Sequence, residues 1–172
     1  AYLESGTERQ REAYIVLTEN EVLSKLDAFT PLLAGTIPIN IDIACSDLDI
    51  ICCWTDKEKF VLALNEQFGH QPGFAIREDN EKKAVIAGFR LGGFDVEVFG
   101  QNIPVKTQHA YRHMLIEHEL LLKYGEDFRQ QVVGLKRQGY KTEPAFARLL
   151  GLSGDPYDEL LKIDVKSCIF VS

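Results

Sequence analysis

The chain has 172 residues, which suits one domain or a core with a helical annex. Hydrophobic residues make up 45% of it, enough to bury a sizeable core, and this excludes a wholly disordered chain. The net charge of -7 argues against nucleic-acid binding unless a local basic patch is present.

No apolar run reaches the length of a membrane helix and no signal peptide is evident, so we expect a cytoplasmic protein without a membrane partner. The four cysteines form no Cys-x-x-Cys motif, and two of them are adjacent inside an apolar run. They are expected to be reduced thiols rather than disulfides or zinc ligands, and are Cys45, Cys52, Cys53 and Cys168.

Residues 7–29 are expected to form one helix that ends before Pro31, because apolar residues recur there at roughly helical intervals. A short apolar strand over residues 32–36 should follow. Between residues 37 and 44, isoleucines alternate with other residues, and this period of two predicts an exposed strand or hairpin arm.

A second strand, apolar almost throughout, is predicted over residues 47–54. Thr55 and Glu58 fit a capping box for a helix that runs to about Phe68 and is closed by Gly69. Three more strands are expected over residues 74–77, 84–91 and 94–99, with Gly92 and Gly93 as the hairpin turn between the last two.

After Pro104 the pattern becomes helical. Helices are predicted over residues 106–123 and 126–137, and two more begin at Thr142 and Asp155. The sequence therefore predicts an α/β (α+β) fold. A mixed sheet with flanking helices should occupy residues 1–104, and a helical region packed on that core should occupy residues 105–172.

Two pairs of carboxylates lie on strand faces. On the strand from residue 47, Asp47 and Asp49 share one face, with their Cα atoms about 6.6 Å apart. On the strand from residue 94, Asp95 and Glu97 share a face as well. If these strands are neighbours, up to four carboxylates face one cleft, and a divalent cation would remove their repulsion. All-oxygen ligands favour Mg²⁺ or Mn²⁺.

Glu97 lies deeper in apolar sequence than Asp95, which follows the Gly92-Gly93 turn. A buried carboxylate has the larger desolvation cost and the greater need of a cation. We therefore expect Glu97 to be the metal ligand and Asp95 to be solvated or outside the first layer of ligands.

The acidic pair has a companion upstream. An apolar strand leads to Gly35 and Thr36, a gap of ten residues follows, and then come Asp47 and Asp49. This order resembles the signature of the nucleotidyltransferase superfamily, which is apolar-Gly-Ser, a gap of about ten, Asp-apolar-Asp on a strand, and a third acid on a later strand. In this chain the third acid would be Glu97 or Asp95.

Further segments are similar to an uncharacterised bacterial family, domain of unknown function 4269, and together they cover most of the chain. They are residues 34–38, 46–51, 97–101, 110–114 and 141–147. Two features depart from the superfamily pattern. Thr36 replaces the usual Ser, and the gap, which usually holds a helix with phosphate-binding amides, is expected to be extended here.

The resemblance implies metal-dependent transfer of a nucleoside monophosphate from a nucleoside triphosphate to an unknown acceptor. Asp47, Asp49 and Glu97 would be catalytic and metal-binding, with Asp95 in reserve as a ligand. The nucleotide would contact Gly35 and Thr36, and basic residues could assist, namely Arg112, Lys136 and Lys141. The alternatives are another Mg²⁺- or Mn²⁺-dependent phosphoryl-transfer enzyme or phosphohydrolase, or an inactive binding module that keeps the fold. The sequence does not indicate an oligomeric state.

His109, His113 and Glu117 are spaced four residues apart on a predicted helix. Two histidines at this spacing can ligate zinc, but neither a third soft ligand nor the His-Glu-x-x-His order is present. They are therefore interpreted as ordinary residues of the helix face.

Overall fold

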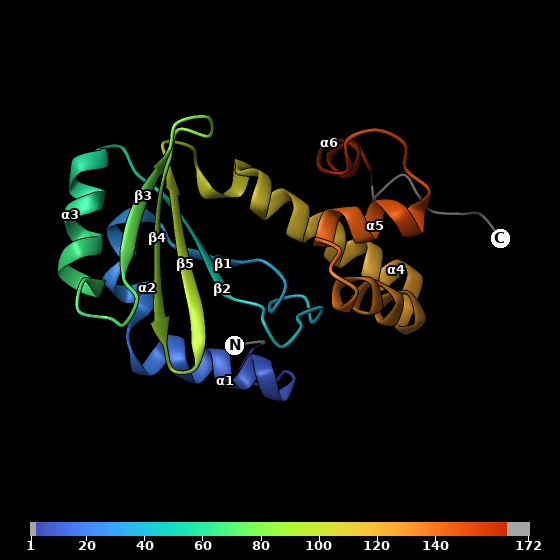
Figure 1. Ribbon diagram of the computed structural model, residues 1–172, viewed down its shortest axis with the longest axis horizontal. Coiled ribbons are helices and arrows are strands. Elements are labelled where there is room, and N and C mark those ends of the chain that lie inside the picture. The colour runs from blue at the N-terminus through green and yellow to red at the C-terminus, as the bar shows by residue number, and fades with distance from the viewer. Residues whose placement is uncertain (1–2, 165–172) are drawn as a thin grey trace.

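The computed structural model describes residues 3–164. The protein has an α+β fold with one mixed sheet of five strands in the order β1-β2-β5-β4-β3 (Figure 1). The strands are β1 (Leu32–Ala34), β2 (Leu48–Cys53), β3 (Ala75–Asp79), β4 (Ala84–Leu91) and β5 (Phe94–Gln101). The predicted fold class is confirmed.

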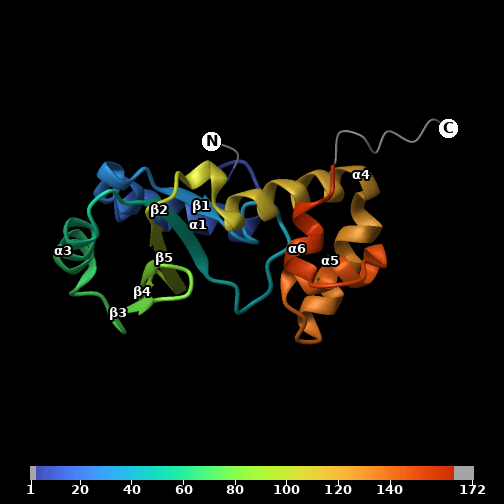
Figure 2. The ribbon, with the colours of Figure 1, turned by 90° about the horizontal axis from the view of Figure 1, so that it is seen from above.

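The helices form two groups: the first packs beside the sheet, and the second extends away from the sheet along the long axis of the molecule (Figures 1 and 2). The first group is α1 (Glu8–Glu19), α2 (Val22–Lys25), a 3-10 turn (Asp27–Phe29) and α3 (Lys57–Phe68). The second group is a 3-10 turn (Val105–Thr107), α4 (His109–Arg137), α5 (Thr142–Leu150) and α6 (Pro156–Leu161). Among the described helices, none combines the length and apolarity needed to cross a membrane.

The central strands are paired in two ways: a tight turn joins β4 to β5, and β5 also pairs with the distant strand β2. Gly92 and Gly93 both have positive φ, 56° and 84°, as a two-residue turn of the favoured hand requires, and they join β4 to β5. Strands β2 and β5 then pair in parallel, with Leu48 beside Val96. This parallel pairing brings together two segments that are far apart in the sequence.

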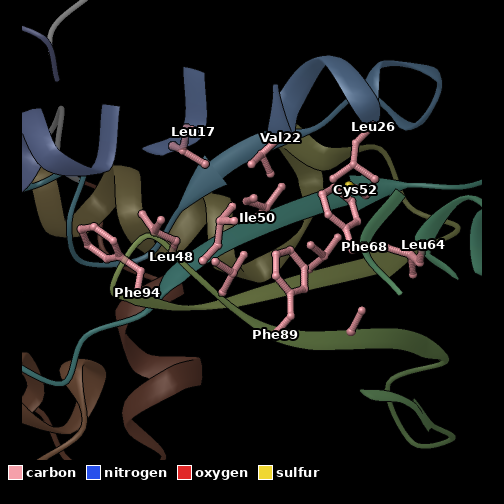
Figure 3. Close-up of a cluster of buried hydrophobic side chains, with 14 of the residues drawn as sticks. Leu17, Val22, Leu26, Leu48, Ile50, Cys52, Leu64, Phe68, Phe89 and Phe94 are labelled. Atoms are coloured by element: carbon pink, nitrogen blue, oxygen red, sulfur yellow. The ribbon is translucent and has the colours of Figure 1, made fainter. Parts of the chain in front are cut away.

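One face of the sheet is the main hydrophobic core. Leu48, Ile50 and Cys52 of β2 are fully buried there, at 0% exposure, under residues of the first helices (Figure 3). Phe60 of α3 also lies at 0% exposure and packs so closely on Gly100 that a Cβ at that glycine would collide with its ring. The predicted division of β2 into an apolar face and an acidic face therefore matches the fold.

The other face of the sheet is only partly covered. A second hydrophobic cluster joins Ala34, Ile51 and the half-buried Phe99 to buried residues of α4, α5 and α6, including Leu121 and Phe146. The part of this face that the helices do not cover carries the acidic residues.

The N-terminal segment is not one helix over residues 7–29, as predicted. Helix α1 begins at a capping box formed by Thr7 and Gln10 and ends with Asn20 as its C-cap. Glu21 then has a left-handed φ of 54°, which an α-helix cannot include. The break turns the chain so that Val22 and Leu26, both fully buried, reach the same core as Leu17.

The prediction of an extended arm over residues 37–44 is wrong. Residues 37–40 form turns and 41–43 have no regular structure. The backbone closes with hydrogen bonds from Asn40 to the Ile37 carbonyl (3.2 Å) and from Ile41 to the Thr36 carbonyl (3.2 Å). Ile37 is buried in the main core, whereas Ile39 and Ile41 are buried in the second cluster. Burial of these isoleucines in the two clusters, without any strand pairing, thus accounts for the apolar residues in this segment.

Side chains, rather than a strand partner, bind the carbonyls of this loop. Gln10 of α1 donates to the Ile37 carbonyl (2.8 Å) and the Pro38 carbonyl (3.2 Å). From α4, Arg129 donates to the carbonyls of residues 39 (2.6 Å) and 40 (3.0 Å), and Lys136 donates to that of residue 41 (2.7 Å). The loop is therefore held between the first and second helical groups.

The remaining elements agree with the sequence apart from details. Helix α3 is capped by Asp56, which accepts from the Lys59 amide, and not by the predicted capping box at Thr55. The two helices predicted after Pro104 are continuous from His109 to Arg137 except at Gly125, whose φ of 76° and ψ of -165° break the helix between them. Of the cysteines, Cys45, Cys52 and Cys53 are free thiols, and Cys168 lies outside the described residues.

Candidate functional site

Asp49 and Glu97 are neighbours across the parallel pair of strands. The register places Asp49 of β2 directly beside Glu97 of β5, and both side chains are half-buried. Residues paired in this way point to the same face of the sheet. Gly88 of β4 lies on the other side of Glu97 and adds no side chain between the acid and β3.

The Asp49 carboxylate also lies against the backbone of Gly35. Gly35 has a φ of 78°, which favours glycine, and a Cβ at this position would collide with the Asp49 carboxylate. Antiparallel pairing of β1 with β2, with Ala34 beside Asp49, sets this approach. A glycine is thus needed at position 35 for two reasons: the backbone there has a positive φ, and a Cβ would collide with the Asp49 carboxylate.

The Asp49 carboxyl is destabilised in its ionised form. Burial is the first cause, repulsion from Asp47 and Glu97 adds to it, and together they raise the pKa of Asp49 from 3.8 to about 7. Lys136 acts in the opposite direction but does not outweigh them. A carboxylate in this condition gains more than an exposed one from a bound cation.

Glu97 and Asp95 differ in their surroundings. The Arg77 guanidinium of β3 lies 3.3 Å from a Glu97 carboxylate oxygen, with the Glu97 side chain 38% exposed. Asp95 pairs with Arg90 at 3.1 Å and is 69% exposed. Glu97 faces Asp49, whereas Asp95 lies toward the hairpin turn and is solvated.

A cavity of about 840 Å³ lies between the acidic face of the sheet and the second helical group. Asp49 and Glu97 line it from the sheet, together with Gly35 and Thr36. Its opposite wall comes from α4, α5 and α6. Residues on that wall include His113, Glu117, Thr142, Glu143 and Tyr157.

Basic residues from the β3–β4 hairpin region complete the lining on the sheet side. Arg77 and Lys82 both line the cavity, and sequence reasoning did not select either of them. The polar residues of the helical wall were missed too. His113 and Glu117 are 5% and 4% exposed, so they are not ordinary residues of the helix face. The available signal was that Glu117 shares its face of α4 with the buried Leu120 and Leu121.

The other selected residues lie around the cavity and not on its walls, as far as residues 3–164 define them. Asp47 is half-buried, directly precedes β2 and interacts electrostatically with Asp49. Lys136 is 6% exposed, with its ammonium bonded to the Ile41 carbonyl. Arg112 and Lys141 are exposed.

Thr36 is bound into the loop that follows it. Its hydroxyl donates to that of Ser46 at 3.3 Å, and the Ser46 hydroxyl accepts from the Ile43 amide at 2.9 Å. This contact closes residues 36–46 into a loop whose end is joined to Asp47. The loop therefore brings the Gly35-Thr36 turn and the acidic pair together without the helix that the resemblance would place there.

The donor chemistry of the site fits Mg²⁺ or Mn²⁺. Asp49 and Glu97 offer oxygen atoms only, and the like charges around Asp49 leave it in need of a cation. Within residues 3–164, no three His, Cys, Asp or Glu side chains are grouped so that they could hold a metal ion by themselves. Mg²⁺ commonly binds one or two carboxylates together with substrate phosphates, and the residues present suit that kind of site.

The fold is that of the nucleotidyltransferases. A structure of Cid1, described with its RNA terminal uridylyl transferase activity, superposes with a TM-score of 0.62 at 11% identity, covering 87% of this chain and 52% of that one. Cid1 poly(U) polymerase with MgGTP bound gives 0.57 at 12% identity, covering 76% and 42%. The GLD-2/RNP-8 complex gives 0.59 at 15% identity, covering 94% and 70%. The chain spans about half the length of the Cid1 chains that it matches.

The chain belongs to the family described as Domain of unknown function (DUF4269), whose model matches residues 15–163. The resemblance inferred from the sequence, both to this family and to the nucleotidyltransferases, is confirmed. Comparison with curated proteins finds no match.

Proposed function

We propose that this protein catalyses metal-dependent nucleotidyl transfer, moving a nucleoside monophosphate from a nucleoside triphosphate to a hydroxyl group of an acceptor. One observation carries the proposal. Asp49 and Glu97 lie side by side at the wall of a cavity, and the Gly35 backbone packs on the Asp49 carboxylate. Three parts of a nucleotidyltransferase signature are thus brought together. The glycine turn at Gly35 contacts Asp49, and Asp49 is paired with the later acid, Glu97.

In the proposed reaction, Asp49 and Glu97 would hold the cation together with substrate phosphate oxygens, Asp47 would add a ligand from just before β2, and Glu97 would also accept the proton of the acceptor hydroxyl. The acceptor oxygen forms a bond to the α-phosphorus, and the bond from that phosphorus to the bridging oxygen breaks, so that pyrophosphate leaves. A bound Mg²⁺ or Mn²⁺ supplies Lewis-acid stabilisation of the charge on the phosphate oxygens. Arg77, the ion-pair partner of Glu97, comes from β3, whereas Asp49 lies on the other side of β5, on β2, so the proposed metal and acceptor are placed on the side of Glu97 away from the guanidinium.

The cavity suggests where the triphosphate lies. Gly35 and Thr36 present backbone to it, and Arg77 and Lys82 are the arginine and lysine side chains that line it. Arginine and lysine are the usual partners of phosphate oxygens. We assign phosphate contacts to these four residues rather than to the exposed Arg112 and Lys141. Lys136 acts indirectly in this scheme, because it holds the Ile41 carbonyl and so the loop that contains Thr36.

Calorimetric titration tests the proposal with Mn²⁺ and a non-hydrolysable nucleoside triphosphate. We expect metal-dependent nucleotide binding in the wild type, its loss in Asp49→Asn, and its retention in the matched control Asp95→Asn, whose carboxylate is solvated. Transfer is measured with α-phosphate-labelled triphosphates, and Glu97→Gln should lower it about a hundredfold, as loss of a general base does.

Two results would contradict the assignment. If the Asp49→Asn variant bound the nucleotide and Mn²⁺ as the wild type does, the metal would not be bound at Asp49. Release of phosphate without any transfer product would show that the protein is a phosphohydrolase, and nucleotidyl transfer would then be the wrong reaction for this site.

A further inference from the structure

The helical wall of the cavity holds two buried oxygen atoms without hydrogen-bond partners. The side chains of Gln108 and Glu117 are 2% and 4% exposed, and both line the cavity. In each, one side-chain oxygen, Oε1, is buried and accepts no hydrogen bond from the described residues. Buried polar atoms are normally satisfied, so two unpartnered oxygens in the residues of one cavity point to a ligand that hydrogen-bonds to them.

The hydrogen bonds of Gln108 fix which of its two terminal atoms is without a partner. Its Nε2 donates to the Cys52 carbonyl and to the Ile103 carbonyl, both at 2.9 Å. Since both partners are carbonyls, the nitrogen must be on that side. The remaining atom, Oε1, is an acceptor only. Gln108 Oε1 therefore lacks a hydrogen-bond donor, which an N–H or O–H group of a ligand could supply.

The described lining of the same wall includes the carboxyl groups of Glu117 and Glu143 but no lysine or arginine. The buried ammonium of Lys136 is not part of that lining and is bonded to the Ile41 carbonyl. The Lys136 ammonium interacts electrostatically with four carboxyl groups, which are those of Asp42, Asp49, Glu117 and Glu143.

His113 is hydrogen-bonded to a backbone carbonyl rather than to either carboxyl group. Its Nε2 lies 2.9 Å from the Tyr157 carbonyl and must carry the proton of that hydrogen bond, because a carbonyl only accepts. Its Nδ1 lies 3.6 Å from the Glu143 carboxylate, too far for a good hydrogen bond. A cationic ligand would therefore find two carboxyl groups, those of Glu117 and Glu143, that share the Lys136 ammonium with Asp42 and Asp49.

The acid-base state of Glu117 agrees with this geometry. Burial, with repulsion from Glu143 as the second cause, raises the pKa of Glu117 from 4.5 to about 8. At neutral pH its carboxyl therefore carries a proton when no ligand is bound. A ligand ammonium at this position would take the place of that proton as the positive partner.

We propose that Gln108, Glu117 and Glu143 form a binding site for a protonated amine, and that the acceptor is a small molecule with both an amine and a hydroxyl group. The second part rests on the proposed function. On the sheet side Arg77 and Lys82 accompany Asp49 and Glu97, where metal and phosphates are expected, whereas the described lining of the helical side carries Glu117 and Glu143 without any lysine or arginine. Its volume of about 840 Å³ lies in the range of small-molecule sites, roughly 300–1,000 Å³.

The test measures binding of two amines against their neutral counterparts, by calorimetry without nucleotide or metal. Glucosamine is compared with glucose, and diaminopropanol with glycerol. We expect each amine to bind at least about tenfold more tightly than its counterpart, as a hydrogen-bonded charge pair implies. Glu117→Gln and Glu143→Gln should each abolish most of that preference. Glu119→Gln, an exposed acid on the same helix, is the matched control and should keep it.

Equal affinity for amine and neutral compound, or an unchanged preference in Glu117→Gln, would overturn the proposal. So would a Glu117→Gln variant that loses affinity for the nucleoside triphosphate and not for the amines, because the wall would then be part of the nucleotide site. Unfolding curves of each variant exclude loss of structure as the cause. The two proposals fail separately, because amine binding through Glu117 without any transfer product would refute only the enzymatic function and the acceptor role.

Discussion

The substitution Glu117→Gln should make the protein more stable at neutral pH. Glutamine has nearly the shape of a protonated glutamate, and the wild-type carboxyl is kept protonated in the folded state by burial and by Glu143, which raise its pKa to about 8. In the unfolded chain it ionises near 4.5. Each tenfold change in proton affinity is worth about 1.36 kcal/mol, and pH 7 lies 2.5 units above 4.5, so the folded wild type carries a penalty of at most about 3.4 kcal/mol there.

The pH dependence has a definite sign. Below pH 4.5 the Glu117 carboxyl is protonated in both states and costs nothing. Between pH 4.5 and about 8 the folded state binds more protons than the unfolded state, so the stability of the wild type falls as the pH rises. Above about pH 8 the carboxyl is ionised in both states, and the penalty stays constant. The variant lacks this carboxyl, so its stability advantage should grow through that window and then level off.

Urea unfolding at a series of pH values measures the effect, with the slope of free energy against urea checked for constancy. Glu119→Gln controls for loss of an acid from the exposed side of α4, and it should change stability by less than about 0.5 kcal/mol with no trend in pH. If the difference between Glu117→Gln and wild type were the same at pH 4.5 and pH 8, Glu117 would not be an uncompensated buried acid. The reasoning about the helical wall would then be refuted.

Two further predictions concern the surroundings of Asp49. Gly35→Ala should destabilise the protein by more than Gly93→Ala, because both sites have positive φ, costing about 1–2 kcal/mol, but only the first adds a collision with the Asp49 carboxylate. Equal losses in thermal or urea unfolding would show that the carboxylate moves aside freely. Lys136→Met should cost about 1–3 kcal/mol, since it leaves a loop carbonyl without its donor, whereas the exposed Lys106→Met should cost little. A Lys136→Met variant as stable as the wild type would mean that the loop does not depend on this ammonium.

Errors in the sequence analysis arose where one local pattern fits two structures. The isoleucines of residues 37–44 recur at every second position as in a strand, yet they belong to a loop that places Ile37 in one hydrophobic cluster and Ile39 and Ile41 in the other. Its carbonyls are bound by Gln10, Arg129 and Lys136, which come from distant parts of the chain. A pattern of burial does not reveal where backbone hydrogen bonds go, and those partners decide between strand and loop.

The helical wall shows a second limit of sequence reasoning. Glu117 and His113 look like ordinary polar residues on a long helix, and a neighbouring apolar stripe is common on such helices. They are buried because α5 and α6 pack beside α4 and bring Glu143 and Tyr157 to them. That packing depends on contacts between segments tens of residues apart.

The sequence by itself determined the local features: the apolar and acidic faces of β2, the Gly92-Gly93 turn, the interruption of the long helix at Gly125 and the order of strands and helices along the chain. These depend on periodicity and on backbone angles that few residues can adopt. The tertiary structure alone decided that Asp49 lies beside Glu97, because parallel pairing of β2 with β5 joins strands separated by α3, β3 and β4. It also placed the acidic wall across from that pair, since the two sides of a cavity come from elements whose contact no local pattern encodes.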